Sequence, residues 1–403
     1  MTARRSSDEP EDTGNGTNRL WSERAAARLG FDRLGAALGR PGLAPYLLLA
    51  AVYALDVPVL STVRYLQIGY HPYLVNPATV MVPVLATYAI WSSRRLRDRF
   101  EAVVDDLLPD EDPLPTASRE PPRRPWFDRA IRRLGTPDGV DEREQLATLI
   151  APSLKWLLLV AAWGLYVAWI LRSPTVQQLI LESEGPVIGG IKYGVLLPFV
   201  YLPLAVEFVA TYLGVIVVFP VQIRAVGLID FQDPLGFGGL RPVGDLVRQA
   251  TTHYLLGLAG YVAGIGIGHL LGQAGFVPQT GLLTTAFIGA ATVLGVALFA
   301  FPVVVLHGHM KAAKHDRIHA LATEVERRGP EDDTNMFPDT SLPDSPADGS
   351  EYLHLYVKLR KVENTREFPI DVSHLQELVL AALVPYLAHV TVTFLLSYTG
   401  GGH

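Results

Sequence analysis

The sequence predicts an all-α protein, a polytopic bundle of about seven transmembrane helices. Hydrophobic residues make up 49% of its 403 residues, and they are gathered in long uninterrupted blocks. A block of about twenty residues crosses the ~30 Å hydrocarbon core of a bilayer as a helix. Most charged residues lie in two segments between the blocks. We therefore expect a multi-pass protein of the cell membrane, with the lipid bilayer as its first partner.

The apolar blocks can be followed along the chain from one end to the other. The fourth is the longest and contains Pro198, Pro203 and Pro220. We expect it to form one kinked helix, because two crossings of about 17 residues each would barely span a bilayer; two helices are the alternative. The seven blocks are residues 43–60, 73–91, 151–171, 187–221, 252–271, 282–306 and 378–396.

Basic residues gather at one end of the predicted helices. They follow the second, fourth and sixth blocks, whereas the opposite loops offer only Arg64 and Arg172. Because loops rich in Arg and Lys stay in the cytoplasm, the N-terminus is predicted inside the cell and the C-terminus outside. The residues that carry this signal are Arg94, Arg95, Arg97, Arg99, Arg224, Arg241, Arg248, Lys311, Lys314 and Arg317.

Two segments outside the crossings predict cytoplasmic structure. The first is an amphipathic helix that leads into a proline-rich acidic linker. The second extends helix six, passes through an acidic proline-rich stretch and returns as a helix over 351–364, which predicts an antiparallel helical stalk. The predicted division is 1–42 (cytoplasmic tail and interfacial helix), 43–93 (two crossings), 94–149 (cytoplasmic insertion), 150–306 (four crossings), 307–370 (stalk) and 371–403 (last crossing and external C-terminus).

Ionisable side chains inside the predicted crossings are the first candidates for function. The candidates are Asp56, Lys192, Glu207, His269 and His389. Each costs about 2.5–3.5 kcal/mol or more at membrane depth unless it is paired or hydrated. Lys192 and Glu207 cannot pair, because they lie ~22 Å apart along one helix. Lys192 can instead reach the edge of the bilayer, whereas Asp56 and Glu207 either form buried hydrogen-bonded pairs or line a path for ions, protons or a polar ligand.

Gly260, Gly264 and Gly268 recur at every fourth position of the fifth block. Glycines at this spacing leave one helix face bare, so that another helix can approach closely. The stripe predicts tight packing within the subunit, with the interface of a homo-oligomer as the alternative.

His315 and His319 lie one helical turn apart at the base of helix six, and Asp316 is adjacent. Two histidines on one helix face can bind a divalent metal or titrate near neutral pH. The spacing provides no third ligand, and a solvated helix face is the alternative, so the sequence predicts no metal or other cofactor.

Several classes of function find no support in the sequence. The chain has no cysteine, which excludes disulfides, thiolate metal sites and cysteine nucleophiles. The loop 231–246 is rich in glycine but lacks the Lys-Ser/Thr of a phosphate loop, and Gly236, Gly238 and Gly239 instead predict a tight turn. No Ser-His arrangement lies at membrane depth. We therefore predict neither an enzyme nor a nucleic-acid-binding protein.

Two resemblances accompany these patterns. The use of 28 Arg against six Lys, together with acidic exposed segments and no cysteine, resembles the proteins of salt-loving archaea. The predicted topology resembles that of the insect chemoreceptor class of seven-helix channels, in which a stalk precedes a pore-lining helix seven. That likeness covers topology and no sequence motif, and it implies a pore edge near His389, Thr391, Thr393 and Ser397. The segments FQDPLGFGGLRPVGDL and ENTREFPIDV also resemble parts of prokaryotic multi-pass proteins, without implying an activity.

The leading functional prediction is a membrane channel or transporter with a polar path among the first, fourth, fifth and seventh helices. The contrasting prediction is a non-transporting scaffold or sensor that acts through its cytoplasmic stalk. The directions in which the side chains of Asp56, Glu207 and His389 point distinguish these two predictions. Convergence on one cavity favours transport, whereas separate capping of each group by its own structural partner favours a scaffold.

Overall fold

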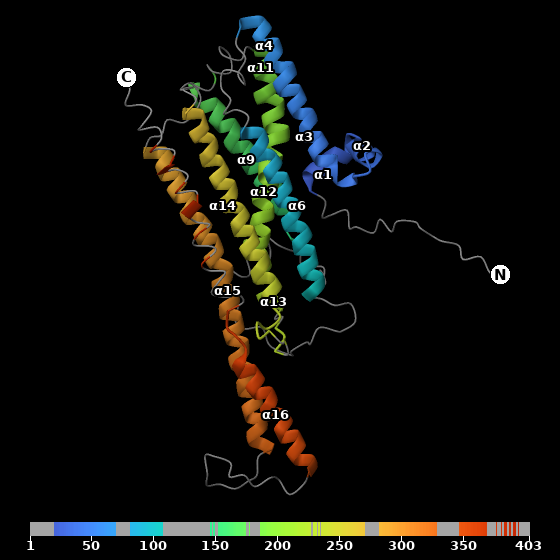
Figure 1. Ribbon diagram of the computed structural model, residues 1–403, viewed down its shortest axis with the longest axis vertical. Coiled ribbons are helices and arrows are strands. Elements are labelled where there is room, and N and C mark those ends of the chain that lie inside the picture. The colour runs from blue at the N-terminus through green and yellow to red at the C-terminus, as the bar shows by residue number, and fades with distance from the viewer. Residues whose placement is uncertain are drawn as a thin grey trace, which may run out of the picture.

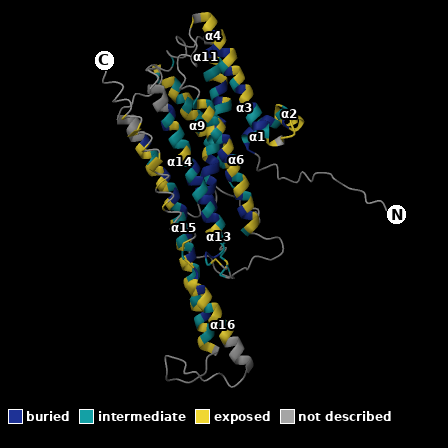
Figure 2. Ribbon diagram, in the orientation of Figure 1, coloured by how far each residue is buried: buried dark blue, intermediate teal, exposed yellow. Residues whose placement is uncertain are grey.

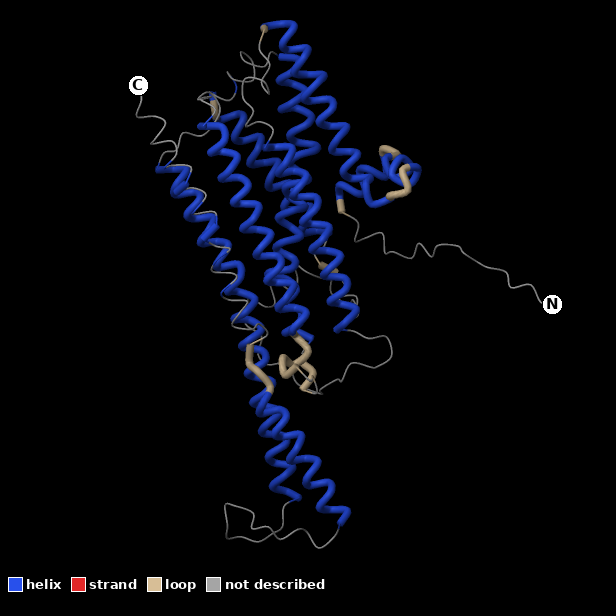
Figure 3. Tube along the Cα trace, in the orientation of Figure 1, coloured by secondary structure: helices blue, strands red, loops and turns tan. Residues whose placement is uncertain are grey.

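The computed structural model describes residues 20–69, 81–107, 146, 148–149, 152–174, 177, 186–226, 229–231, 233, 235–270, 282–328 and 346–368, and eight separate positions between 376 and 394. Every regular element among these residues is a helix (Figure 3). The long helices run side by side, with α4 and the start of α11 at one end and α13 and the stalk toward the other (Figure 1).

The helices follow the apolar blocks of the sequence. In the first half of the chain they are α1 (Trp21–Arg28), α2 (Phe31–Ala37), η1 (Pro41–Leu43), α3 (Ala44–Ala54), η2 (Leu55–Leu60), α4 (Ser61–Ile68), α6 (Met81–Leu107) and α9 (Pro152–Arg172). In the second half they are α11 (Pro186–Ile191), η5 (Lys192–Tyr201), α12 (Leu202–Leu213), η6 (Gly214–Val218), α13 (Phe219–Val226), α14 (Arg241–Leu270), α15 (Leu282–Arg328) and α16 (Pro346–Asn364).

Four helices in the described part of the chain are long and apolar enough to cross a membrane. They are Ala44–Gln67, Pro152–Arg172, Val187–Arg224 and Ile288–Arg327, which match the first, third, fourth and sixth predicted blocks. The start of the second block (73–80) and most of the seventh lie outside the described residues, and the fifth block forms the second half of α14. Seven crossings and the direction of the chain across the membrane stay predictions.

The fourth block is one continuous helix, as predicted. It runs without a break from α11 to α13 and takes up its prolines in widened π-helical turns, η5 around Pro198 and η6 just before Pro220. Proline lacks an N–H and its ring presses on the carbonyl four residues earlier, so a wider turn relieves both problems. The first apolar helix does the same in η2, around Pro58.

The helices differ in how much of their surface is covered. No residue of α9 is buried, and it exposes large side chains such as Trp156, Leu165 and Leu171, as a lipid-facing helix does. By contrast, α6, α12, η6, α13, α14 and α15 enclose a large core, and the buried parts of the helices are dark blue in Figure 2. Within this core the ring of Phe100 meets that of Phe219 edge-on. This core consists of Leu96, Phe100, Val103, Val104, Leu146, Tyr212, Val215, Ile216, Phe219, Ile223, Leu240, Val243, Leu246, Ala250, Leu306 and Met310.

The predicted helical hairpin is present beyond this core. The second half of α15 continues as a single helix, and α16 folds back beside it (Figure 1). Leu321 of α15 and Val362 of α16 are buried. We call this hairpin of α15 and α16 the stalk.

Candidate functional site

Asp56 and Lys192 form an ion pair between the first and fourth apolar helices. Lys192 Nζ lies 3.1 Å from Asp56 Oδ1, and both side chains are largely covered, with 15% and 11% of their surfaces exposed. Both residues stand in π-helical segments, and Ser61 Oγ donates to the carbonyl of Asp56 at 2.9 Å. The Lys192 side chain is thus held by a carboxylate of a neighbouring helix.

Glu207 holds the first turn of α1. Its carboxylate accepts hydrogen bonds from the backbone N–H groups of Trp21 and Ser22 and, at 3.3 Å, from the hydroxyl of Ser22. The first N–H groups of any helix have no partner within the helix, and a carboxylate placed there also interacts favourably with the helix dipole. Glu207 on α12 thus caps a helix that lies far away in sequence, and it is 8% exposed.

A cluster of charges surrounds this cap. Glu23 of α1 pairs with Arg94 and Arg97 of α6 at 3.1 Å each, and one of its oxygens accepts the N–H of Leu20 at 3.0 Å. Arg94 also donates to the carbonyl of Gly42, just before α3. We name the group formed by Glu23, Arg94, Arg97, Lys155 and Glu207 the charged cluster; Lys155, near the start of α9, belongs to it because its charge acts on Glu207.

Sequence reasoning did not anticipate the charged cluster. The only local signal is Glu23, which follows Leu20 by three residues as in a helix-capping motif. The partners of Glu23 lie on α6, and neither the rotation nor the offset of that helix can be inferred from hydropathy.

A second polar contact that the sequence does not reveal joins α6 to α14. The hydroxyl of Tyr88 donates to the carbonyl of His253 at 2.9 Å and lies 3.2 Å from Nδ1 of the same residue. Trp91 meets the imidazole edge-on.

The glycine stripe of α14 faces α6 within the same chain. A Cβ added to Gly264 would come 2.8 Å from the side chain of Met81, and one added to Gly260 would come 3.5 Å from Leu85. At Gly264 the approach requires a bare backbone, whereas a Cβ at Gly260 would make an ordinary contact. The side chains of 265–270 lie outside the described residues, so Gly268 and His269 of the stripe are not placed.

The base of the stalk is tied to the bundle by several contacts. His307 of α15 stacks on Phe368 with ring centroids 4.1 Å apart, and Lys314 donates to the carbonyl of Thr365 at 2.9 Å. The N–H of Arg366 donates to the carbonyl of Gly236 at 2.7 Å, and its guanidinium lies 4.7 Å from the centre of the Phe237 ring. The loop before α14 is thus in contact with the residues that follow α16.

Asp233 organises the loop on the bundle side of this junction. Its carboxylate accepts the N–H groups of Leu235, Phe237 and Gly239 at 2.8–3.0 Å. Partial burial alone raises the pKa of Asp233, but these three donors outweigh it and bring the pKa below the ordinary value for an aspartate. Gly236, Gly238 and Gly239 all have positive φ, between 63° and 75°, which confirms the predicted tight turn.

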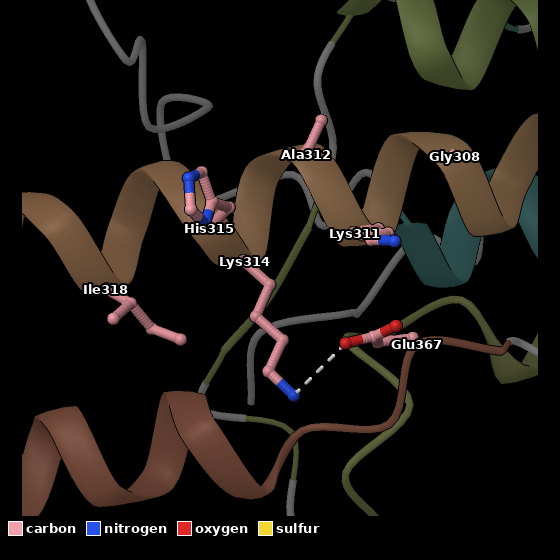
Figure 4. Close-up of a pocket in the computed structure, with 7 residues that line it drawn as sticks. All are labelled: Gly308, Lys311, Ala312, Lys314, His315, Ile318 and Glu367. Atoms are coloured by element: carbon pink, nitrogen blue, oxygen red, sulfur yellow. Dashed lines mark ion pairs between the residues drawn. The ribbon is translucent and has the colours of Figure 1, made fainter.

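A hollow of about 470 Å³ opens beside the base of the stalk. In Figure 4, Lys314 extends from α15 toward Glu367, and its Nζ lies 3.8 Å from the carboxylate. The residues that line the hollow are Gly308, Lys311, Ala312, Lys314, His315, Ile318 and Glu367.

Of the predicted path residues that are described, Asp56 and Lys192 come together, whereas Glu207 is bound elsewhere. Asp56 pairs with Lys192 of the fourth apolar helix, whereas Glu207 accepts hydrogen bonds from the first turn of α1. His389 lies outside the described residues. None of the family models, curated proteins or solved structures compared with the chain matches it, so the geometry alone carries the functional argument.

Proposed function

We propose that the protein is a non-transporting membrane scaffold or sensor, in which the apolar helices anchor a cytoplasmic helical assembly. That assembly consists of the core between α6, α13, α14 and α15 together with the stalk. The observation that carries the proposal is the cap that Glu207 provides for α1. The carboxylate best placed to line a path is used to hold two elements together.

The charged cluster supports a definite position of the membrane boundary. Gly42, Arg94 and Lys155 each stand within a few residues of the end of a predicted crossing, and Glu207 belongs to the same cluster. From residue 187 to 207 the helix rises about 30 Å, which is one bilayer thickness. In this arrangement the fourth crossing ends at Glu207. The residues after Glu207 lie outside the bilayer, where they pack against α6 and α14 and not against lipid.

The same arrangement supports the predicted direction of the chain. Arg224 lies in the last turn of the fourth helix. Arg241 begins α14, and Arg248 follows it two turns later, on the side of Glu207 that faces the stalk. With these residues in the cytoplasm, the stalk extends into the cell and the contact between Asp56 and Lys192 lies toward the outer half of the bilayer.

Ion flux in proteoliposomes tests the proposal. We expect the wild-type protein to conduct no more than protein-free liposomes under Na⁺, K⁺ and H⁺ gradients, and the variants Glu207→Gln and Asp56→Asn to behave identically. A flux above background that falls in Glu207→Gln would overturn the scaffold proposal in favour of a channel or transporter. Gramicidin added at the end confirms that the gradients were intact.

A further inference from the structure

The side chains of His315 and His319 meet on one face of α15. Their Nε2 atoms lie 3.1 Å apart, and the two rings stand nearly perpendicular, with centroids separated by 4.3 Å. Both residues are exposed. The two nitrogens are thus close enough to bind one ion placed between them.

This separation suits a pair of ligands to one metal ion. Two imidazole nitrogens, each about 2.0–2.1 Å from Zn²⁺, stand about 2.9 Å apart at a right angle and about 3.4 Å apart at the tetrahedral angle. The observed 3.1 Å lies between these limits. The side chains therefore need only small rotations to bind one ion together.

The surroundings leave room for the remaining ligands. His315 lines the hollow beside the stalk base, and the neighbouring Lys314 is directed away toward Glu367 (Figure 4). Among the described residues no group of three or more His, Asp or Glu side chains is arranged around a metal position. The protein thus supplies two ligands, and water or a small anion in the hollow completes the coordination.

We propose that His315 and His319 form an open, two-histidine binding site for a late first-row divalent cation on the stalk. Imidazole ligands select Zn²⁺, Ni²⁺ and Cu²⁺ over Mg²⁺ and Ca²⁺, which prefer oxygen ligands. Zn²⁺ is the ion that such a site takes when copper is scarce. The proposal does not depend on whether the protein transports ions.

Calorimetric titration of the purified full-length protein with ZnCl₂ tests the site. The single variants His315→Ala and His319→Ala each remove one ligand of a chelate, so each is expected to weaken this binding event at least tenfold. His354→Ala is the matched control, because His354 is an exposed histidine on α16. It is expected to bind Zn²⁺ as the wild type does.

Superimposable isotherms for the wild type, His315→Ala and His319→Ala would overturn the proposal. Electron paramagnetic resonance with Cu²⁺ provides a second test that counts ligands directly. The spectrum is expected to lose a species with two coordinated imidazoles in either single variant and to retain it in His354→Ala. A species with two imidazoles that persists in both single variants would place the metal elsewhere and contradict the assignment.

Discussion

Glu207 illustrates how one side chain can join two parts of a membrane protein. It lies 185 residues after Ser22, yet it accepts the backbone N–H of that residue and of Trp21. Both N–H groups and the Ser22 hydroxyl point to a carboxylate that is almost fully covered. A buried donor that loses its acceptor costs about 1–3 kcal/mol, more than an ordinary exposed hydrogen bond contributes.

Removal of this carboxylate is expected to release α1. In Glu207→Ala, the first turn of α1 loses its cap, and we expect the amides of 21–28 to exchange hydrogen about ten to a hundred times faster, in keeping with a loss of ~1.4–2.8 kcal/mol. Hydrogen exchange measured by mass spectrometry gives the rate. Glu324→Gln is the control, because Glu324 pairs with Arg327 on the stalk part of α15. Unchanged exchange in Glu207→Ala would show that the cap does not hold the helix.

At the scale of elements, the loop between α13 and α14 joins the bundle to the stalk. Asp233 fixes the loop from inside, and Arg366 binds it from the stalk side. The pKa of Asp233 is lower in the folded loop than in the unfolded chain, so the folded loop binds fewer protons. The stabilisation is therefore complete above the unfolded pKa of about 4 and is lost as the pH falls below it through the folded pKa.

The loop is thus expected to loosen in acid and on loss of the charge. Asp233→Asn retains one acceptor oxygen but no charge, and we expect the amides of Phe237 and Gly239 to exchange about tenfold faster at neutral pH, in keeping with ~1.4 kcal/mol. The wild-type loop is expected to show the same loss of protection, after correction for intrinsic exchange, only below about pH 4. Asp245→Asn, which alters a pair with Arg248 on α14, is the control. Equal loop protection in Asp233→Asn and the wild type would contradict the assigned role of the carboxylate.

At the scale of the whole molecule, the direction of the chain across the membrane can be tested with single cysteines. The protein has no cysteine of its own, so each introduced thiol reports one position. Gln67→Cys, at the end of the first apolar helix, is expected to react with a membrane-impermeant maleimide in intact cells. Ala320→Cys, exposed on the stalk, is expected to react only after permeabilisation. Labelling in the reverse order would invert the proposed orientation.

Much of this architecture could be predicted from the sequence, because long apolar blocks specify helices wherever they occur. The single helix over the fourth block followed from length alone. Hydropathy does not distinguish lipid-facing side chains from a protein core, however. Two-thirds of the apolar window in Val187–Arg224 is buried, whereas none of the window in Pro152–Arg172 is. From hydropathy alone, the fourth block therefore seemed to lie wholly in lipid. In the structure, its second half packs against other helices.

The candidate site was predictable only in part, for a related reason. Ionisable residues in apolar helices could be found by inspection, and Asp56, Lys192 and Glu207 all make buried polar contacts. Their partners could not be found, because helix rotation and axial offset are set by packing between segments distant in sequence. Two of the three donors to Glu207 are backbone N–H groups, which have no signature in the sequence.

The length of α15 has a mechanical consequence. Its 47 residues form one uninterrupted helix about 70 Å long, which begins in the apolar bundle and ends at the tip of the stalk. Such a helix acts as a lever: a tilt of 5° about the level of Leu306 would displace Arg328 by about 3 Å. The contact of His307 with Phe368 lies next to Leu306, the level about which the tilt is taken. A small change in bilayer thickness or lateral pressure that tilts the membrane part of α15 would thus move the tip of the stalk. A protein bound at the tip could detect such a displacement.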